Sequence, residues 1–381
     1  MKVVIAIDSL KGSLSSLEAG SAISEGIHKV NQKAEVIVRP LADGGEGTVE
    51  ALALGMGGRL EKVIVSGPLA AKVEATYGII DSSKMAIIEM SAAAGITLIS
   101  EEERNPLETT TYGVGEIIKD AISKGCRSFI VGIGGSATND GGIGMLQALG
   151  FEFLDANGKQ VALGAKGLKH IEQINDEHII PELKECHFKV ACDVTNTLCG
   201  EQGCSAIFGP QKGATPTMIM QMDKWLAYYA YLTKEKYPSA DMNYPGTGAA
   251  GGLGFAFRSF LNATLESGIK IILDETKLEK YVQDADIVVT GEGRLDGQTV
   301  FGKAPIGVAK IAKKHNKPVI AFSGCVTEDA VLCNEHGIDA FFPILRSVVS
   351  LNEAMNPQNA RKNMIATVEQ AFRLISIYGG N

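Results

Sequence analysis

The sequence predicts an α/β protein that contains at least one doubly wound parallel sheet. Short apolar runs rich in Val and Ile recur along the 381 residues, and runs without alternation are typical of parallel strands buried on both faces. Stretches with the amphipathic spacing of helices follow several of these runs. This order favours a sheet with helices packed against it, in a chain long enough for two domains or one large α/β domain.

The strand candidates occur at both ends of the chain and in its middle. They are Val3–Ile7, Val36–Arg39, Phe129–Gly132, Phe188–Ala191, Ile287–Thr290 and Val319–Ser323. Helices are predicted over Ser15–Val30 and Pro305–His315. Ser15 and Glu18, three residues apart, predict a capping box at the start of the first helix.

The rhythm of strands and helices changes between about residues 67 and 110. Two short strand candidates, Val73–Ile79 and Met85–Met90, lie there between the turn signals Gly67-Pro68 and Asn105-Pro106. The C-terminal part of the chain returns to the regular alternation seen at the start. We therefore expect a second, differently built domain to begin near residue 67.

Composition and charge narrow the class of protein. The net charge of −8 argues against a general nucleic-acid binder. The seven cysteines show neither C-x-x-C pairs nor zinc-site spacing, which indicates reduced thiols in a cytosolic protein. The first apolar run is too short for a signal peptide, and no run approaches the length of a membrane span. We therefore expect a cytoplasmic protein with no membrane partner, and the sequence leaves a homo-oligomer open.

The 44 glycines are unevenly distributed. About half of them lie in five windows: Asp43–Thr48, Gly132–Gly150, Gly200–Gly213, Gly246–Gly254 and Gly291–Gly302. Charged and hydroxyl residues accompany them there, where a plain linker would have Pro and Ser. Glycine allows a backbone to approach a ligand closely, so these windows are candidate ligand loops, the alternative being tight turns.

The strongest window follows the predicted strand Phe129–Gly132. Successive N–H groups of a small-residue loop, together with the next helix N-terminus, form a cradle for an anion. Hydroxyl and amide side chains of the same loop can add donors to phosphate oxygens. The predicted phosphate-binding residues are Gly134, Gly135, Ser136, Thr138, Asn139 and, from a later window, Lys212. A strand–helix turn without a ligand is the alternative.

Two named nucleotide motifs fit this sequence less well. Gly132-x-Gly134-x-x-Ala137, with Asp155 further on, loosely matches a dinucleotide fingerprint, which would suggest an NAD-dependent dehydrogenase. The helix should begin inside that motif, but three more glycines interrupt it, so this is the weaker hypothesis. Gly297–Lys303 resembles a P-loop but starts well after the strand and has Ala304 in place of Ser or Thr, which excludes it.

Carboxylates follow four of the predicted strands. Asp8, Asp43 with Glu46, Asp193, and Glu292 with Asp296 stand at these positions, with Lys11 and Arg294 nearby. Ligands of open α/β sheets bind at the carboxyl ends of the strands, although a single such residue is as readily explained by an Asx turn or helix cap. Carboxylates, cations and glycine loops together suit phosphoryl transfer. No histidine lies in a glycine window, so a histidine-based triad is not expected.

Seven motifs, in order along the whole chain, resemble the bacterial glycerate kinases of the glycerate 2-kinase type. They are Asp8–Ser13, Ala42–Thr48, Gly134–Gly142, Ala191–Asn196, Phe208–Gly213, Pro245–Gly252 and Thr290–Thr299. One small departure is Thr197, where the family usually has proline. The resemblance implies ATP-dependent phosphorylation of D-glycerate to 2-phosphoglycerate. Phosphorylation at C3, or a regulator that binds nucleotide or sugar phosphate without turnover, are the alternatives.

The resemblance also implies two α/β domains with the active site in the cleft between them. A Rossmann-like domain would comprise residues 1–66 and 284–381, and residues 67–283 would form the inserted domain. Asp193, Lys11 and Asp8 are the catalytic candidates, with Asp193 as the base and Lys11 near the transferred phosphoryl group. Glu292 and Asp296 are the candidates for Mg²⁺. The substrate candidates are Arg294, for the glycerate carboxylate, Asp43, Glu46, Asn196 and Ser323.

Overall fold

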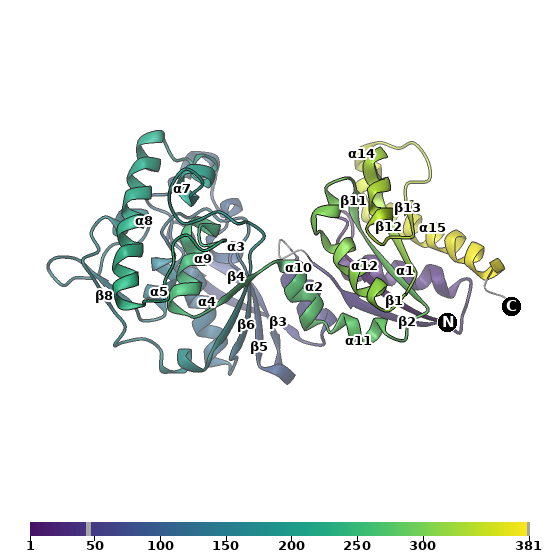
Figure 1. The fold of residues 1–381 in the computed structure, drawn as a ribbon, viewed down its shortest axis with the longest axis horizontal. Coiled ribbons are helices and arrows are strands. Elements are labelled where there is room, and N and C mark those ends of the chain that lie inside the picture. The colour runs from purple at the N-terminus through teal and green to yellow at the C-terminus, as the bar shows by residue number, and fades with distance from the viewer. Residues whose placement is uncertain (43–46, 379–381) are drawn as a thin grey trace. The chain divides into compact units, whose positions relative to one another are not determined.

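The computed structural model describes residues 1–42 and 47–378, and its mixed α/β architecture confirms the predicted fold class. The chain divides into two compact units (Figure 1). Unit 1 combines the N-terminal strands, most of helix α2 and the chain from Ile269 onward, and unit 2 contains Gly57–Gly268. The domain borders that we expect near residues 67 and 284 stay a prediction.

Unit 1 is built on a sheet of five parallel strands in the order β13-β12-β11-β1-β2. The strands are β1 (Lys2–Ile7), β2 (Glu35–Pro40), β11 (Ile287–Leu295), β12 (Val319–Val326) and β13 (Ala340–Pro343). Central strand β1 pairs with β11, with Ile5 opposite Val289, and with β2, with Val4 opposite Ile37. The continuous apolar runs of the sequence are therefore buried parallel strands, as predicted.

Strand β11 is longer than the sequence suggested, and Gly291 is the reason. Its φ of +154° is one that side chains rarely adopt, and a Cβ there would lie 1.8 Å from the carbonyl oxygen of Phe322. With glycine at this point the ladder with β12 continues as far as the pairs formed by Arg294 and Leu295. Glu292 and Arg294 therefore lie on the strand itself, and their predicted loop position is wrong.

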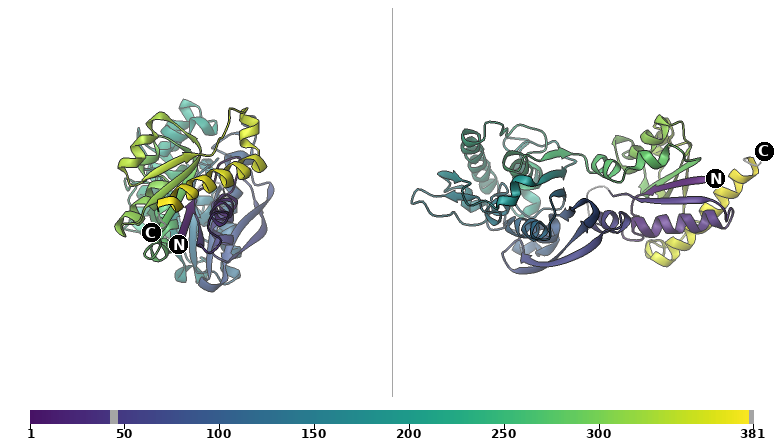
Figure 2. Two further views of the ribbon diagram at one scale, coloured as in Figure 1. Left: turned by 90° about the vertical axis from the view of Figure 1, so that its right-hand side faces the viewer. Right: turned by 90° about the horizontal axis from the view of Figure 1, so that it is seen from below.

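Helices cover both faces of this sheet. The α1 helix (Ser16–His28) and α15 (Pro357–Tyr378) pack side by side on one face (Figure 2), and their apolar residues share one core with Ile5 and Ile7. The predicted capping box of α1 is present, since the N–H of Glu18 donates to Ser15 Oγ and the Glu18 carboxylate accepts from the Ser15 N–H. The α12 helix (Ala304–Lys314) packs on β11, β1 and β12.

The remaining helices of unit 1 are short and connect the strands or flank the C-terminal helix. They are α2 (Thr48–Gly55), α10 (Gly268–Glu275), α11 (Leu278–Val282), α13 (Leu332–Glu335) and α14 (Leu351–Met355). A single helical turn, η6 (Thr299–Phe301), follows β11. It lies next to the acidic side chains described below.

Unit 2 contains a mixed six-stranded sheet in the order β10-β9-β6-β5-β4-β3. Its strands are β3 (Arg59–Ser66), β4 (Lys72–Ile80), β5 (Met85–Glu89), β6 (Ser128–Gly132), β9 (His187–Ala191) and β10 (Thr264–Glu266). Strand β4 runs antiparallel to both of its neighbours, β3 and β5, and the pairs β5–β6, β6–β9 and β9–β10 are parallel. A separate hairpin pairs β7 (Glu152–Leu154) with β8 (Gln173–Asn175). The change of rhythm in the sequence thus corresponds to a differently built sheet.

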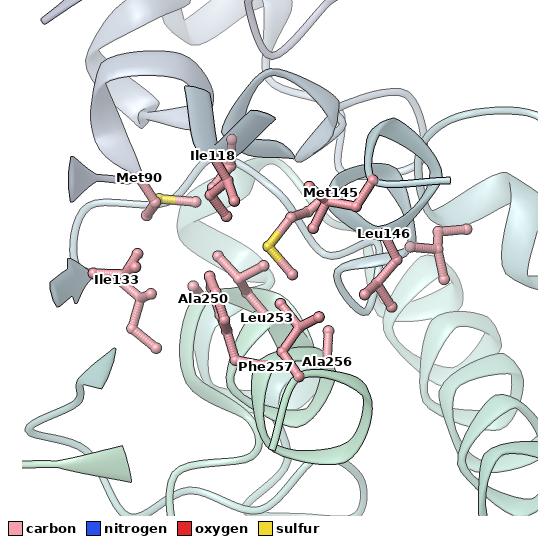
Figure 3. Packing of buried hydrophobic residues seen from close by; sticks show 14 of the residues in the cluster. Met90, Ile118, Ile133, Met145, Leu146, Ala250, Leu253, Ala256 and Phe257 are labelled. Carbon is pink, nitrogen blue, oxygen red and sulfur yellow. The ribbon is translucent and has the colours of Figure 1, made fainter. Parts of the chain in front are cut away.

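The helices of unit 2 surround a core drawn from segments far apart in the sequence (Figure 3). They are α3 (Ser91–Ala94), α4 (Tyr112–Ser123), α5 (Ile143–Ala148), α6 (Ala165–Leu168), α7 (Cys204–Phe208), α8 (Pro216–Lys236) and α9 (Ala249–Phe260). Met90, Ile118, Ile133 and Met145 meet Leu253 of α9 in this core. Because Ile133 opens the glycine loop, that loop begins on a densely packed base.

Two sequence expectations concern the chain as a whole. All seven cysteines are free thiols, as their spacing predicted. Among the residues that the structure describes, no helix is long and apolar enough to cross a membrane.

Candidate active-site residues in the two units

The loop after β6 leaves three consecutive backbone N–H groups available. In the described part of the chain, the N–H groups of Gly134, Gly135 and Ser136 donate to no acceptor, while the Gly135 carbonyl accepts from the Ile96 N–H at 2.8 Å. Gly134 and Gly135 are exposed, Ser136 is only 8% exposed, and Gly135 has a φ of +72°. Successive unpaired N–H groups around a left-handed residue form a concavity that binds anions. The backbone here therefore suits the predicted phosphate site.

The side chain of Lys212 supports this loop from the interior. Its Nζ donates to Ser136 Oγ at 2.8 Å and to the Thr138 carbonyl oxygen at 2.6 Å. Only 1% of Lys212 is exposed. Burial lowers the pKa of its ammonium group to about 8, against the opposing influence of Cys204 and Asp140. Lys212 is thus an interior cation beneath the exposed glycines.

Thr138 and Asn139 also face the interior, although we predicted that their side chains would contact phosphate. Both are fully buried. The Asn139 amide donates to Ser205 Oγ at 2.9 Å, and neither the Thr138 hydroxyl nor Asn139 Oδ1 has a hydrogen-bond partner among the residues that the structure describes. At these buried positions, neither these two side chains nor that of Lys212 faces solvent. The predicted direct contact with a phosphate that enters from solvent therefore does not agree with the structure. The loop turns inward after Ser136, which the sequence pattern could not reveal.

Asp140 is the residue that sequence reasoning missed in this loop. Its carboxylate is fully buried and accepts from the N–H of Thr111 at 2.8 Å, the hydroxyl of Thr111 at 2.9 Å and the N–H of Gly142 at 3.1 Å. Longer contacts at 3.4 Å come from the Thr110 hydroxyl and the Gly144 N–H. The sequence shows three consecutive threonines at 109–111, but nothing in it indicates that they are buried against Asp140. Asp140 fastens the loop to the start of α4.

Asp193 and Asn196 follow β9, the strand next to β6. Because Ala191 pairs with Gly132, Asp193 lies at the same edge of the sheet as the exposed glycines. Asp193 is exposed, and its Oδ1 accepts from the N–H of Gly268 at 3.1 Å. Asn196 is half-buried and its amide donates to the Gln202 carbonyl at 2.9 Å. The predicted catalytic carboxylate of unit 2 and the candidate phosphate loop therefore share one sheet edge.

In unit 1, Asp8 and Glu292 lie at the carboxyl ends of the neighbouring strands β1 and β11. The N–H of Asp8 donates to the Gly291 carbonyl at 3.0 Å, and Asp8 is only 5% exposed. Burial raises the pKa of Glu292, and the negative charges of Asp8 and Asp296 act in the same direction. Thr299, a second residue that the predictions did not include, donates from its hydroxyl to Glu292 Oε1 at 2.7 Å.

Asp296 stands between two cations at this edge. Its carboxylate lies 3.4 Å from Arg294 Nε and 3.5 Å from Lys303 Nζ. The Arg294 side chain is 64% exposed, and Lys11 is exposed in the turn after β1. The structure thus brings together four of the charged residues singled out in the sequence, Asp8, Glu292, Arg294 and Asp296, and adds Lys303 to them.

One of three further substrate candidates, Ser323, is engaged in contacts within the sheet. Ser323 is fully buried, where its hydroxyl donates to the Cys325 carbonyl at 2.8 Å and accepts from the Leu295 N–H at 3.1 Å. It therefore links β12 to β11, and its predicted contact with substrate does not agree with this position. Asp43 and Glu46, the other two, lie outside the described residues.

The predicted donor set for Mg²⁺ consists of two carboxylates, those of Glu292 and Asp296. No group of three or more His, Cys, Asp or Glu side chains with metal-site geometry occurs within the described ranges 1–42 and 47–378. Mg²⁺ is usually held by one or two carboxylates together with the phosphates of a substrate and water. Glu292 and Asp296, both near Thr299, fit such a partial site in residue type, and the assignment stays a prediction.

Comparison with known proteins identifies the family. The sequence profile of the glycerate kinase family matches residues 3–376. The chain belongs to the glycerate kinase family. The glycerate kinase of Haemophilus influenzae is 47% identical over 376 residues, 99% of each chain. The glycerate 2-kinase of Escherichia coli K12 is 46% identical over 378 residues, 98% of this chain and 99% of its own.

A solved structure gives the same result for the fold. A Salmonella typhimurium LT2 protein assigned as glycerate kinase 2 matches with a TM-score of 0.93 and 45% identity, covering 100% of both chains. The resemblance read from the seven sequence motifs is therefore confirmed, and so is the prediction that this member of the glycerate kinase family is an enzyme.

Proposed function

We propose that this protein transfers the γ-phosphoryl group of ATP to the C2 hydroxyl of D-glycerate and releases 2-phosphoglycerate and ADP. The observation that carries the proposal is the row of three available N–H groups at Gly134, Gly135 and Ser136 in a chain of this family. The choice of C2 is supported by the E. coli relative, which is named a glycerate 2-kinase.

The residues suggest how the reaction proceeds. The glycerate hydroxyl oxygen forms the new bond to the γ-phosphorus, the bond between that phosphorus and the β,γ-bridging oxygen breaks, and Asp193 accepts the hydroxyl proton. The N–H groups of the glycine loop and the ammonium group of Lys11 stabilise phosphate charge. Glu292 and Asp296 are the residues that would hold Mg²⁺, which when bound neutralises part of the charge on the nucleotide.

A coupled assay of ADP release tests this function. We expect turnover that requires D-glycerate, ATP and Mg²⁺ together, and NMR of the product distinguishes 2-phosphoglycerate from 3-phosphoglycerate. Nucleotide binding without glycerate-dependent ADP would instead support a regulator, and reduction of a nicotinamide in the presence of glycerate would support the dehydrogenase alternative. Either result would refute the proposed activity.

Arg294 is the proposed partner of the glycerate carboxylate. Its guanidinium is largely exposed and its fork can donate two parallel hydrogen bonds to a planar carboxylate. Arg294→Ala is expected to raise the KM for glycerate on the order of 10–100-fold, the value of a hydrogen bond to a charged group, with a smaller change in kcat. Steady-state kinetics in both substrates measure this. An increase confined to the KM for ATP would contradict the assignment. The KM of Arg294→Lys for glycerate should lie between those of wild type and Arg294→Ala.

A further inference from the structure

Lys212 is a buried cation without a carboxylate in direct contact. It ends the turn η5 (Pro210–Lys212) after α7, and no ion pair of Lys212 occurs among the described residues. Its two hydrogen bonds go to neutral oxygens, Ser136 Oγ and the Thr138 carbonyl. Moving an ammonium group out of water is costly unless a negative charge compensates it. Asp140 is close enough to raise the pKa of Lys212, but burial still lowers it overall, so a further negative charge near the loop would stabilise the ammonium group.

The backbone around Lys212 fixes where the side chain goes. Gly213 follows with a φ of +88°, and a Cβ at that position would lie 2.2 Å from the Arg104 carbonyl oxygen. The turn is thus closely packed against a neighbouring segment. A lysine that was tolerated by chance could extend to solvent, but this one lies inside the glycine loop and contacts Ser136, the third residue of the N–H row.

We infer that Lys212 is a positioning residue for the phosphate site: from the interior it holds Ser136 and Thr138 and adds positive charge behind the N–H groups of Gly134, Gly135 and Ser136. The bound phosphate, in turn, is the anion that compensates the buried ammonium group. This inference rests on the proposed function only in taking ATP as the ligand, and it assigns Lys212 no direct contact with the nucleotide.

Titration distinguishes this role from a merely structural one, because only the positioning role makes the affinity for ATP depend on the charge of Lys212. The pKa of Lys212 falls from 10.5 to about 8 on folding. Between these values the unfolded chain binds more protons, so this group makes the free energy of unfolding increase as pH rises. Over the same range Lys212 loses its charge, so the affinity for ATP should fall. A role in folding alone predicts the first slope without the second.

The groups that face Lys212 do not produce the same effect. Cys204 of α7 and Asp140 of the loop are the titratable groups that influence it. Burial raises the pKa of Cys204 to about 11, so this thiol stays neutral throughout the range of interest. Burial also raises the pKa of Asp140, and loss of its proton would add negative charge. Lys212→Met identifies which group is responsible, since it removes only the ammonium group.

The experiment measures the dissociation constant of Mg²⁺-ATP by calorimetry from pH 7 to 9.5 without glycerate, so that no turnover occurs. We expect Lys212→Met to weaken ATP binding by at least ~10-fold at pH 7 and to abolish the loss of affinity that wild type shows above pH 8. Lys224→Met is the matched control, because Lys224 is an exposed lysine of the same unit and its removal changes net charge equally.

Each outcome decides the inference. A folded Lys212→Met variant that binds ATP as wild type does overturns it. If that variant does not fold, Lys212→Arg replaces it, because a guanidinium keeps its charge over this pH range. Affinity that falls above pH 8 in wild type but not in Lys212→Arg supports the inference, and the same pH dependence in both overturns it. Glycerate-dependent turnover of wild type is measured separately, so a protein that binds ATP through Lys212 but never phosphorylates glycerate would refute the proposed function and leave the inference standing.

Discussion

Asp193→Ala is expected to lower kcat by about 10²–10⁴-fold while the protein remains folded, the usual cost of losing a general base. Asp193 is the exposed carboxylate at the sheet edge shared with the candidate phosphate loop. In the proposed reaction it accepts the proton of the glycerate hydroxyl as the new bond to phosphorus forms. Since a base acts only on the reacting group, kcat should fall much more than either KM rises.

Asp193→Asn separates this role from a structural one. Asp193 Oδ1 accepts the N–H of Gly268, where α10 begins, and an asparagine oxygen can accept the same hydrogen bond. An asparagine cannot take up the hydroxyl proton. Both variants should therefore be almost equally inactive in the ADP-release assay. Restored turnover in Asp193→Asn would mean that the hydrogen bond to Gly268, rather than proton transfer, is what matters, and the base would have to be another residue.

The strands were predictable from sequence because a strand buried on both faces is apolar at nearly every position. A run such as Val3–Ile7 is apolar at every position, and the structure buries every one of its side chains. The C-terminal end of β11 has no such continuous apolar run. It continues beyond Thr290 through two glycines, Glu292 and Arg294 to the buried Leu295. Gly291 permits this because its backbone conformation is one that other residues rarely adopt, and the partner strand β12 begins only at Val319.

The candidate site shows the same division between local and tertiary information. Composition and spacing correctly predicted a glycine loop after β6 and acidic residues at strand ends. Which side chains of that loop reach solvent depends on contacts with distant segments: η5 contributes Lys212, and the segment before α4 contributes Thr111. A sequence pattern carries the type of each residue but not its direction. Hydroxyl and amide side chains in a glycine loop can therefore either hydrogen-bond within the protein interior or contact a phosphate, and the sequence alone does not distinguish the two.

Asp140 should prove to be the most important residue of that scaffold. Asp140→Ala leaves the N–H groups of Thr111 and Gly142 and the Thr111 hydroxyl buried without their acceptor. Each unsatisfied donor costs about 1–3 kcal/mol, so we expect the free energy of unfolding to fall by ~3–5 kcal/mol. Urea denaturation at neutral pH measures the change, and an unaltered dependence on urea concentration would show that the folded state is otherwise intact.

Asp155→Ala is the matched control for this effect. Asp155 also accepts two backbone N–H groups, those of Asn157 and Lys159, but it does so in a turn where water can replace the carboxylate. Its removal should cost less than ~1 kcal/mol. Asp140→Asn should be intermediate, because its oxygen can satisfy some donors while its amide group opposes the others. If Asp140→Ala were as mild as Asp155→Ala, the loop would not depend on this carboxylate, and its attachment to the start of α4 would need another source.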